Sequence, residues 1–314
     1  MRKIFFLAIT AMLVFASCND SDEAATVNEN ASLLSITTEI SAQQKSLRSG
    51  PLSLFPDGST LSLFVCAGTL GTPYPGGPYD NIKASFDGGT ALWSMERPVR
   101  LTSENASVYA LYPYMPSLGN GVNTAQIEHT SQTDYMFGTN AEEQQAVNHN
   151  NPRVRLRMNH ALALLQFRLN KHNYDGQGKV TRVAVGNETG RNDLRSAGTL
   201  SLTNGDVYTM ATEISPAAIE DTDGLYTIPD TTPGNNDYLN VMILPVGNTS
   251  ANGSVQFHFT IDGRVYTYSV PANTTWKQGT KYIYEVTLNG TELQIGDVII
   301  TDWIDGPVSG VEIF

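Results

Sequence analysis

The chain has 314 residues, a net charge of −12 and a charged fraction of only 16%. This excess of acid argues against nucleic acid or an anionic membrane surface as the partner, because both would repel it. Only two cysteines are present, Cys18 and Cys66, and a disulfide scaffold is therefore excluded. The length is enough for two domains with cores of their own.

The first residues have the layout of a secretory signal peptide. Arg2 and Lys3 form a basic start, and residues 4–15 are apolar at all positions but one. Such a run is too short to span a bilayer as a permanent helix. We therefore expect residues 1–17 to be removed on export.

The residues just before Cys18 predict a lipid anchor. Ala16 and Ser17 are small and directly precede the cysteine, an arrangement that resembles the bacterial lipobox, in which the cysteine becomes the new N-terminus and is lipidated. We predict that Cys18 carries this lipid, palmitate included; the alternative is a soluble secreted protein with a chance cysteine. Cys66 then has no partner thiol, and we expect it to behave as a small buried hydrophobe.

Acidic residues follow the proposed anchor at once. Asp20, Asp22 and Glu23 are similar to the acidic tether that sends lipoproteins of the Bacteroidetes to the outer face of the outer membrane. Residues 18–32 are polar and poor in aromatics, which favours a flexible tether. We expect a cell-surface location, with an ordinary solvated linker as the alternative.

The remainder of the chain predicts an all-β fold, because β-branched and aromatic runs alternate with turn-rich pieces. Asp262 and Gly263 stand between two such runs and predict a two-residue hairpin. We expect two β-sandwich domains, residues 33–173 and 174–314. The expected strands are residues 33–40, 60–67, 107–114, 153–158, 163–170, 180–187, 198–203, 238–244, 254–261, 264–270, 281–289 and 296–303.

The sequence lacks the common motifs of catalytic, nucleotide-binding and metal sites. It contains no nucleophile elbow, phosphate-binding loop or dinucleotide-binding fingerprint, and its five histidines lack the spacing of a metal site. We therefore predict that the protein is not an enzyme and needs no cofactor or metal. Tyr74, Tyr79, Tyr109, Tyr112 and Tyr114 could stack on the sugar rings of a glycan, but core packing and loop anchoring are the favoured interpretation.

Several longer stretches follow the lipobox in order: LSLFVCAG, VYALYPYMP, DYMFGTN, VRLRMNHALALLQFRL and WKQGTKYIYEVTLNGTELQIGDVIITDW. Together they resemble the fimbrillin family of the Bacteroidetes, the subunits of type V pili and related surface proteins. The resemblance covers nearly the whole chain. It implies two transthyretin-like, Greek-key β-sandwich domains and a structural or accessory subunit of a cell-surface fimbria.

The family resemblance also implies a way of assembly. In that family a trypsin-like protease cuts the lipoprotein precursor after an arginine, the first strand is released, and a strand from a neighbouring subunit fills the groove. The matching arginine is Arg48, with Ser49 as the new N-terminus; Lys45 is a competing site, and a plain loop arginine is the alternative. The implied partners are other fimbrial subunits, the protease and the outer membrane.

The C-terminus departs from the family pattern, because polymerising subunits usually carry a longer extension after the position of Trp303. Val311 and Ile313 alternate in the short tail, and with Val298, Ile300 and Trp303 they could form a donor strand. Otherwise this strand closes its own domain, as in a tip, anchor or accessory subunit. The alternative function is a surface-anchored lipoprotein that binds a glycan or host ligand and does not polymerise.

Replacing Cys18 tests the predicted anchor. Cys18→Ala removes the thiol that would receive the lipid, so we expect the precursor to stay unlipidated and to leave the membrane fraction. Mass spectrometry and membrane fractionation of the variant measure this. A variant that is still anchored to membranes would contradict the lipobox.

Overall fold

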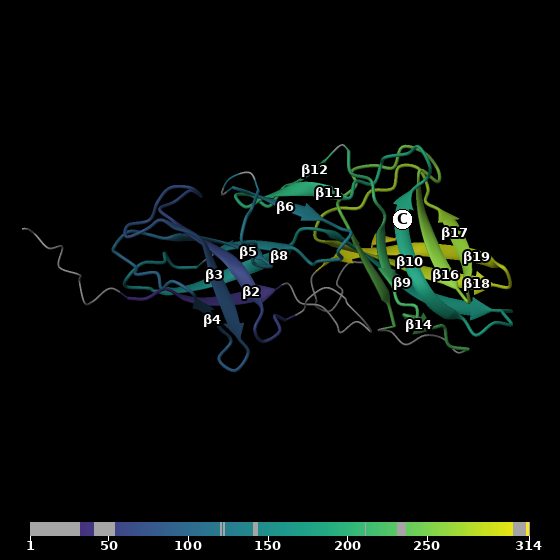
Figure 1. Cartoon of the computed structure of the whole chain (residues 1–314), viewed down its shortest axis with the longest axis horizontal. Coiled ribbons are helices and arrows are strands. Elements are labelled where there is room, and N and C mark those ends of the chain that lie inside the picture. Colours follow the sequence, from purple (N-terminus) through teal and green to yellow (C-terminus); the bar gives the residue numbers. More distant parts are fainter. Residues whose placement is uncertain are drawn as a thin grey trace, which may run out of the picture. The chain divides into compact units, whose positions relative to one another are not determined.

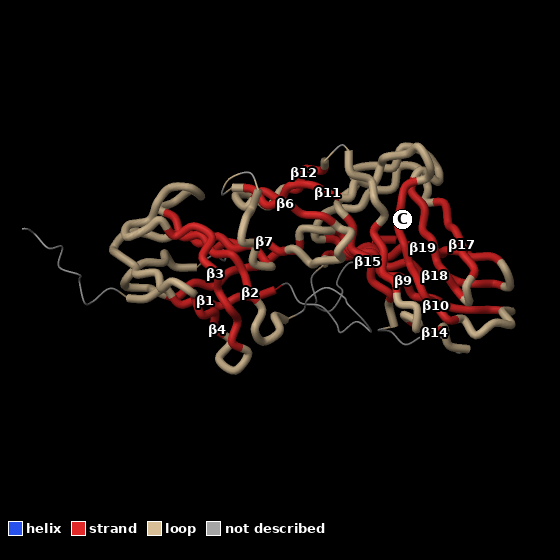
Figure 2. Tube along the Cα trace, in the orientation of Figure 1, coloured by secondary structure: helices blue, strands red, loops and turns tan. Residues whose placement is uncertain are grey.

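The computed structural model describes residues 32–40, 54–119, 121, 123–140, 144–210, 212–230, 237–303 and 312–313. These residues form strands joined by turns and loops, without a helix among them, as Figure 2 shows. Accordingly, no helix in this described part is long and apolar enough to cross a membrane. The predicted all-β class is confirmed.

Seven strands form the first sheet, in the order β1-β8-β7-β5-β2-β3-β4, and several of them are labelled in Figure 1. All neighbours are antiparallel except β1 and β8, which run parallel. The strands in this order are β1 (Ser35–Ile40), β8 (Arg153–His160), β7 (Met136–Asn140), β5 (Ser107–Tyr112), β2 (Thr60–Cys66), β3 (Tyr79–Asp87) and β4 (Leu92–Met95).

A small sheet joins strands that are distant in the sequence. Its order is β12-β11-β6, with β12 (Val207–Thr209), β11 (Ala197–Ser201) and β6 (Thr124–Glu128). Because β6 comes from the first half of the chain and pairs with β11 from the second, this sheet ties the two halves by backbone hydrogen bonds.

Two five-stranded sheets make up most of the second half (Figure 1). One has the order β13-β10-β16-β17, with β14 also paired to β10, and the other has the order β15-β9-β18-β19-β20. The first contains β13 (Ala217–Glu220), β10 (Lys179–Asn187), β16 (Val255–Ile261), β17 (Arg264–Ser269) and β14 (Tyr226–Thr227). The second contains β15 (Leu239–Ile243), β9 (Ala163–His172), β18 (Thr280–Asn289), β19 (Glu292–Asp302) and β20 (Glu312–Ile313).

Buried aromatic rings hold these two sheets together. The ring of Phe167 on β9 lies 5.1 Å from that of Phe257 and 5.2 Å from that of Phe259, both on β16, and both pairs meet edge to face. Tyr284 on β18 stacks on Phe167 at 5.4 Å. Since edge-to-face pairs add to the gain from burial, this cluster is the centre of a β-sandwich.

The strand β9 is buried on both faces, which explains its continuous apolar sequence. Leu165 and Phe167 belong to the core between the two five-stranded sheets, whereas Leu164 packs with Phe64 and Met242 in a separate buried cluster. A strand that is covered on both sides needs apolar residues at successive positions. By contrast, β8 alternates strictly between exposed and buried residues, as expected for a strand with one face in solvent.

The hairpin predicted at Asp262 and Gly263 is present between β16 and β17. Both residues have positive φ, 47° and 78°, as this turn type requires. The Asp262 carboxylate also accepts hydrogen bonds from the backbone N–H groups of Gly178 and Lys179, at 2.8 and 2.9 Å. The turn therefore fixes the segment that leads into β10.

The division into residues 33–173 and 174–314 stays a prediction, as does the transthyretin-like topology. The described pairing places β9, which ends at His172, in one sheet with β15, β18 and β19. This strand precedes the expected boundary but pairs with strands that follow it. Its hydrogen bonds favour a boundary nearer to the turn between β8 and β9.

Phe167→Ala tests the aromatic core. Truncating this ring removes its contacts with both sheets and should lower the free energy of unfolding by about 3–5 kcal/mol. Urea denaturation measures the loss. Val265→Ala, at a side chain that is 58% exposed on β17, is the control and should change little; similar losses in the two variants would contradict the proposed core.

Candidate functional site

The strand β1 is seated on β8 by a parallel ladder that runs from the Ser35 and Arg153 pair to the Ile40 and Met158 pair. The residues at the start of β1 are hydrogen-bonded to two other segments of the chain. The N–H of Ser35 donates to the carbonyl of Pro152 at 2.9 Å, and the N–H of Leu34 donates to the carbonyl of Val99 at 3.0 Å. The strand that the sequence predicts to be releasable is thus an ordered part of the sheet.

One face of β1 covers the core of the seven-stranded sheet. Leu34 and Ile36 are fully buried there and pack with core residues that include Val154 and Leu156 of β8. The opposite face, with Thr37 and Glu39, points to solvent. Fully burying one such apolar side chain is worth about 1.5–3 kcal/mol, so these two residues supply much of what holds β1 in place.

The outer edge of β1 has no strand partner among the described strands. β1 and β4 are the two ends of the sheet and are not hydrogen-bonded to each other. Instead the indole Nε1 of Trp93 on β4 donates to the Thr38 hydroxyl at 3.0 Å. The sequence analysis missed this contact, although Trp93 follows the turn-forming Asp87-Gly88-Gly89.

The residues proposed for lipidation and maturation lie outside the described part of the chain. Cys18, Lys45, Arg48 and Ser49 all fall there, and so does Val311 in the tail. Their roles stay predictions. β1 ends at Ile40, and the expected cut at Arg48 follows it in the sequence.

The proposed C-terminal strand residues are paired within their own sheet. Val298 and Ile300 on β19 lie opposite Tyr284 and Tyr282 on β18, and Ile313 on β20 lies opposite Ile299. β19 is therefore held by β18 along one side and meets the short β20 on the other. This pairing favours the closing alternative over the donor alternative, and the choice stays a proposal.

Trp303 at the end of this strand is anchored firmly. Its side chain is buried and stacks on His160 with ring centroids 4.0 Å apart and planes 4° from parallel. The Nδ1 of His160 is hydrogen-bonded to Asp134 Oδ1 at 2.8 Å, and the N–H of Trp303 donates to the carbonyl of Gly279 at 2.8 Å. His160 ends β8, so this stack joins β19 to the seven-stranded sheet.

The tyrosines considered for glycan stacking have structural contacts. Tyr74 is buried, and its hydroxyl donates to the carbonyl of Glu104 at 2.7 Å while accepting from the N–H of Thr102 at 3.0 Å. Tyr79 is buried too, and Tyr112 packs edge-on against Phe55 at 5.0 Å. The favoured interpretation, core packing and loop anchoring, agrees with these contacts.

The described residues hold no group of three or more His, Cys, Asp or Glu side chains that could bind a metal. Cys66 is a free, buried thiol on β2, and burial raises its pKa, so it is a poor nucleophile. Its behaviour as a small hydrophobe is as expected from the sequence.

A family model for fimbrillin-like proteins matches residues 55–303. The chain belongs to the fimbrillin-like family. The resemblance derived from the sequence motifs is confirmed, and membership favours a fimbrial subunit or adhesion protein of a cell-surface appendage over an enzyme. It also favours other fimbrial subunits as partners.

Two candidate cell adhesion proteins of known structure share the fold of this fimbrillin-like chain. A candidate cell adhesion protein from Bacteroides uniformis matches with a TM-score of 0.61 and 17% identity, over 88% of this chain and 100% of its own. Another from Bacteroides ovatus has a TM-score of 0.61 and 15% identity, over 88% and 99%. The tip fimbrial protein Mfa3 from Porphyromonas gingivalis, truncated at its C-terminus, matches at 0.47 and 9% identity, over 87% and 100%. A search of curated proteins finds no match.

Ile36→Ala tests how β1 is held. Removing this buried side chain leaves a cavity, and we expect the free energy of opening β1 to fall by about 2–5 kcal/mol. Hydrogen exchange of the β1 amides, read by mass spectrometry, measures it. Thr37→Ser, which removes a methyl group from the exposed face of the same strand, should leave exchange almost unchanged; equal acceleration in both would show that burial of Ile36 is not what seats β1.

Proposed function

We propose that the chain is a structural or accessory subunit of a cell-surface fimbria of the type V pilus kind. In this proposal it is exported as an outer membrane lipoprotein on Cys18 and cut between Arg48 and Ser49 by a trypsin-like protease. The observation that carries the proposal is the position of β1 at the edge of the seven-stranded sheet, upstream of Arg48.

Cleavage at Arg48 would leave β1 with no covalent link to the sheet that it completes. It would then be held by the ladder to β8, the bond from Trp93 and the burial of Leu34 and Ile36. All of these are non-covalent and reversible. The lipid anchor at Cys18 would leave with the same fragment.

Loss of β1 would create a surface suited to strand addition. The edge of β8 would expose unpaired N–H and C=O groups beside the apolar positions that Leu34 and Ile36 now fill. A strand with alternating apolar residues from a neighbouring subunit can pair with these backbone groups and fill these apolar positions at the same time. Donation of such a strand is the proposed means of assembly.

The C-terminal strand favours a terminal or accessory place in the fimbria. β19 is paired along β18, and Trp303 is locked against His160. Withdrawing residues Val298, Ile300 and Trp303 as a donor would break these contacts. We therefore propose that the subunit accepts a strand but closes its own C-terminal sheet.

The same pairing favours a second candidate function, a surface-anchored lipoprotein that binds a glycan or host ligand and does not polymerise. In that case Arg48 stays uncut and Cys18 keeps the protein on the outer membrane. Neither candidate has an enzymatic activity.

The N-terminal mass of the protein from its native cell surface decides between the two candidates. After treatment with a trypsin-like protease we expect a chain that begins at Ser49 and then binds other subunits, because the groove is open. Arg48→Gln should block the cut and the binding, whereas Lys45→Gln, a matched change on the same side of the bond, should permit both. Subunit assembly by the Arg48→Gln variant, still lipidated on Cys18, would contradict maturation by cleavage.

A further inference from the structure

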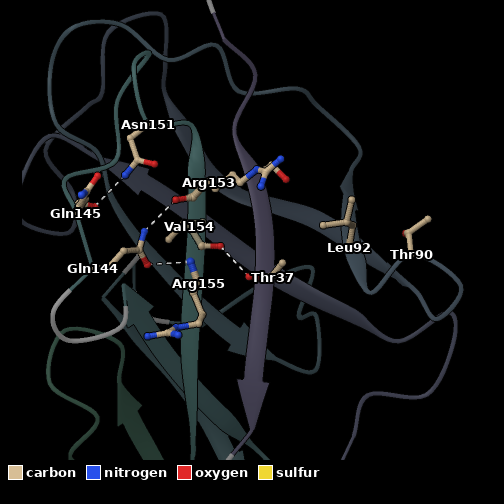
Figure 3. Close-up of a pocket in the computed structure, with 10 residues that line it drawn as sticks. Thr37, Thr90, Leu92, Gln144, Gln145, Asn151, Arg153, Val154 and Arg155 are labelled. Carbon is tan, nitrogen blue, oxygen red and sulfur yellow. Dashed lines mark hydrogen bonds between the residues drawn. The ribbon is translucent and has the colours of Figure 1, made fainter.

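A shallow hollow of about 590 Å³ lies across the solvent face of β1 and β8. It is called the β1 hollow here, and it is lined by Ser35, Thr37, Gln145, Asn151, Arg153 and Arg155, among others. Figure 3 shows Gln145 and Asn151 on one side of β1 and Thr90 and Leu92 on the other. Its volume falls within the range of roughly 300–1,000 Å³ that is usual for ligand pockets.

Two backbone groups of β8 beside the β1 hollow are hydrogen-bonded to one side chain. The Gln144 side chain donates from Nε2 to the carbonyl of Arg153 at 3.0 Å and accepts from the N–H of Arg155 at 2.9 Å, as Figure 3 shows. Val154 between them lies in the ladder to β1. These two groups of β8 are therefore not free to pair with an added peptide strand, and the side chains that line the hollow are taken as the recognition elements.

The charge of the β1 hollow is opposite to that of the protein. The chain carries a net −12, yet two arginines at alternate positions of β8 line this one hollow. Arg153 has no ion pair with any described residue, and Arg155 has only an exposed contact of 3.5 Å between Nε and Glu39 Oε2. Because exposed ion pairs are worth little, both guanidinium groups can serve an incoming anion.

Neutral polar groups surround these two charges. Gln145 supplies an amide, and Ser35 supplies a hydroxyl from β1 itself. Asn151 supplies its amide oxygen, because its Nδ2 donates to the carbonyls of Gln145 and Ala146 at 3.3 and 3.2 Å. On the far side Leu92 is 40% exposed and offers an apolar contact. Arginine binds carboxylates through paired hydrogen bonds, and amides with hydroxyls suit the hydroxyl groups of a sugar.

We propose that the β1 hollow binds a carboxylate-bearing saccharide, with Arg153 on the carboxylate, Arg155 adding positive charge to the lining, and the amides and hydroxyls on the ring. The pairing of charge with many neutral polar groups argues against a bare anion. The site belongs to the uncut chain, because Ser35 and Thr37 lie on β1, upstream of Arg48.

Calorimetric titration of the full-length chain with a trisaccharide of galacturonic acid tests this proposal. We expect saturable binding with one site, and none with the neutral trisaccharide of galactose. Arg153→Ala should weaken binding at least about tenfold, as loss of a charged hydrogen-bonded contact does. Arg157→Ala is the matched control, since Arg157 is exposed on the same face of β8 but does not line the hollow; binding should stay unchanged.

A second variant examines the sugar contacts rather than the charge. Gln145→Ala keeps both arginines and should weaken binding of the acidic trisaccharide without affecting the fold, because the Gln145 side chain is exposed. A triglutamate peptide is the probe for carboxylates without a sugar ring, and we expect it to bind more weakly than the trisaccharide.

Four results would overturn the proposal. They are no binding of the acidic trisaccharide, equal affinity for the neutral one, equal affinity for triglutamate, and equal losses in Arg153→Ala and Arg157→Ala. Equal losses in these two variants would mean that the trisaccharide is attracted to the basic face of β8 as a whole and is not bound at a defined site. All titrations use the uncut full-length chain, and none of them measures cleavage or assembly, so a failure here is distinct from a failure of the fimbrial role.

Discussion

The parallel pairing of β1 with β8 is the constraint on which the seven-stranded sheet depends. One parallel ladder and two buried side chains, Leu34 and Ile36, complete both the hydrogen bonding of β8 and the apolar core beneath it. The outer edge of β1 is bonded to β4 only through Trp93 and Thr38 among the described residues. A strand held in this way is ordered in the intact chain, yet as an end strand it is joined to the sheet by a single backbone ladder.

The two ends of the described fold differ in how they are held. At the C-terminal end, β19 pairs with β18 over nearly its full length, and Trp303 stacks on His160, which is itself bonded to Asp134. Releasing that strand would expose two buried tyrosine partners and unstack a buried ring. This asymmetry is the physical basis for proposing that the chain accepts a strand and does not donate one.

Much of the fold could be predicted from local patterns, because each of these patterns reports burial directly. The alternation in β8, the apolar run in β9 and the Asp262 and Gly263 turn each predicted the right element. β3 was missed because Asp80 and Asn81 interrupt its start, and β19 was expected to begin later than Glu292 because Gly296 and Asp297 lie within it. Pairings between distant segments, such as β1 with β8 or β6 with β11, leave no trace in either strand's own sequence.

The same limit explains why the β1 hollow could not be read from the sequence, and it reveals a link between the two proposals. The arginines of β8 look like the solvent face of an ordinary strand until Ser35 and Thr37 of β1 are laid beside them. A ligand that needs β1 for its site stabilises the state in which β1 is seated, by mass action. Release of β1 would remove one wall of the hollow along with its hydroxyls. Ligand binding in the hollow and acceptance of a donor strand then compete, because the first needs β1 beside β8 and the second needs β1 to leave. The hollow is complete only in the uncut chain.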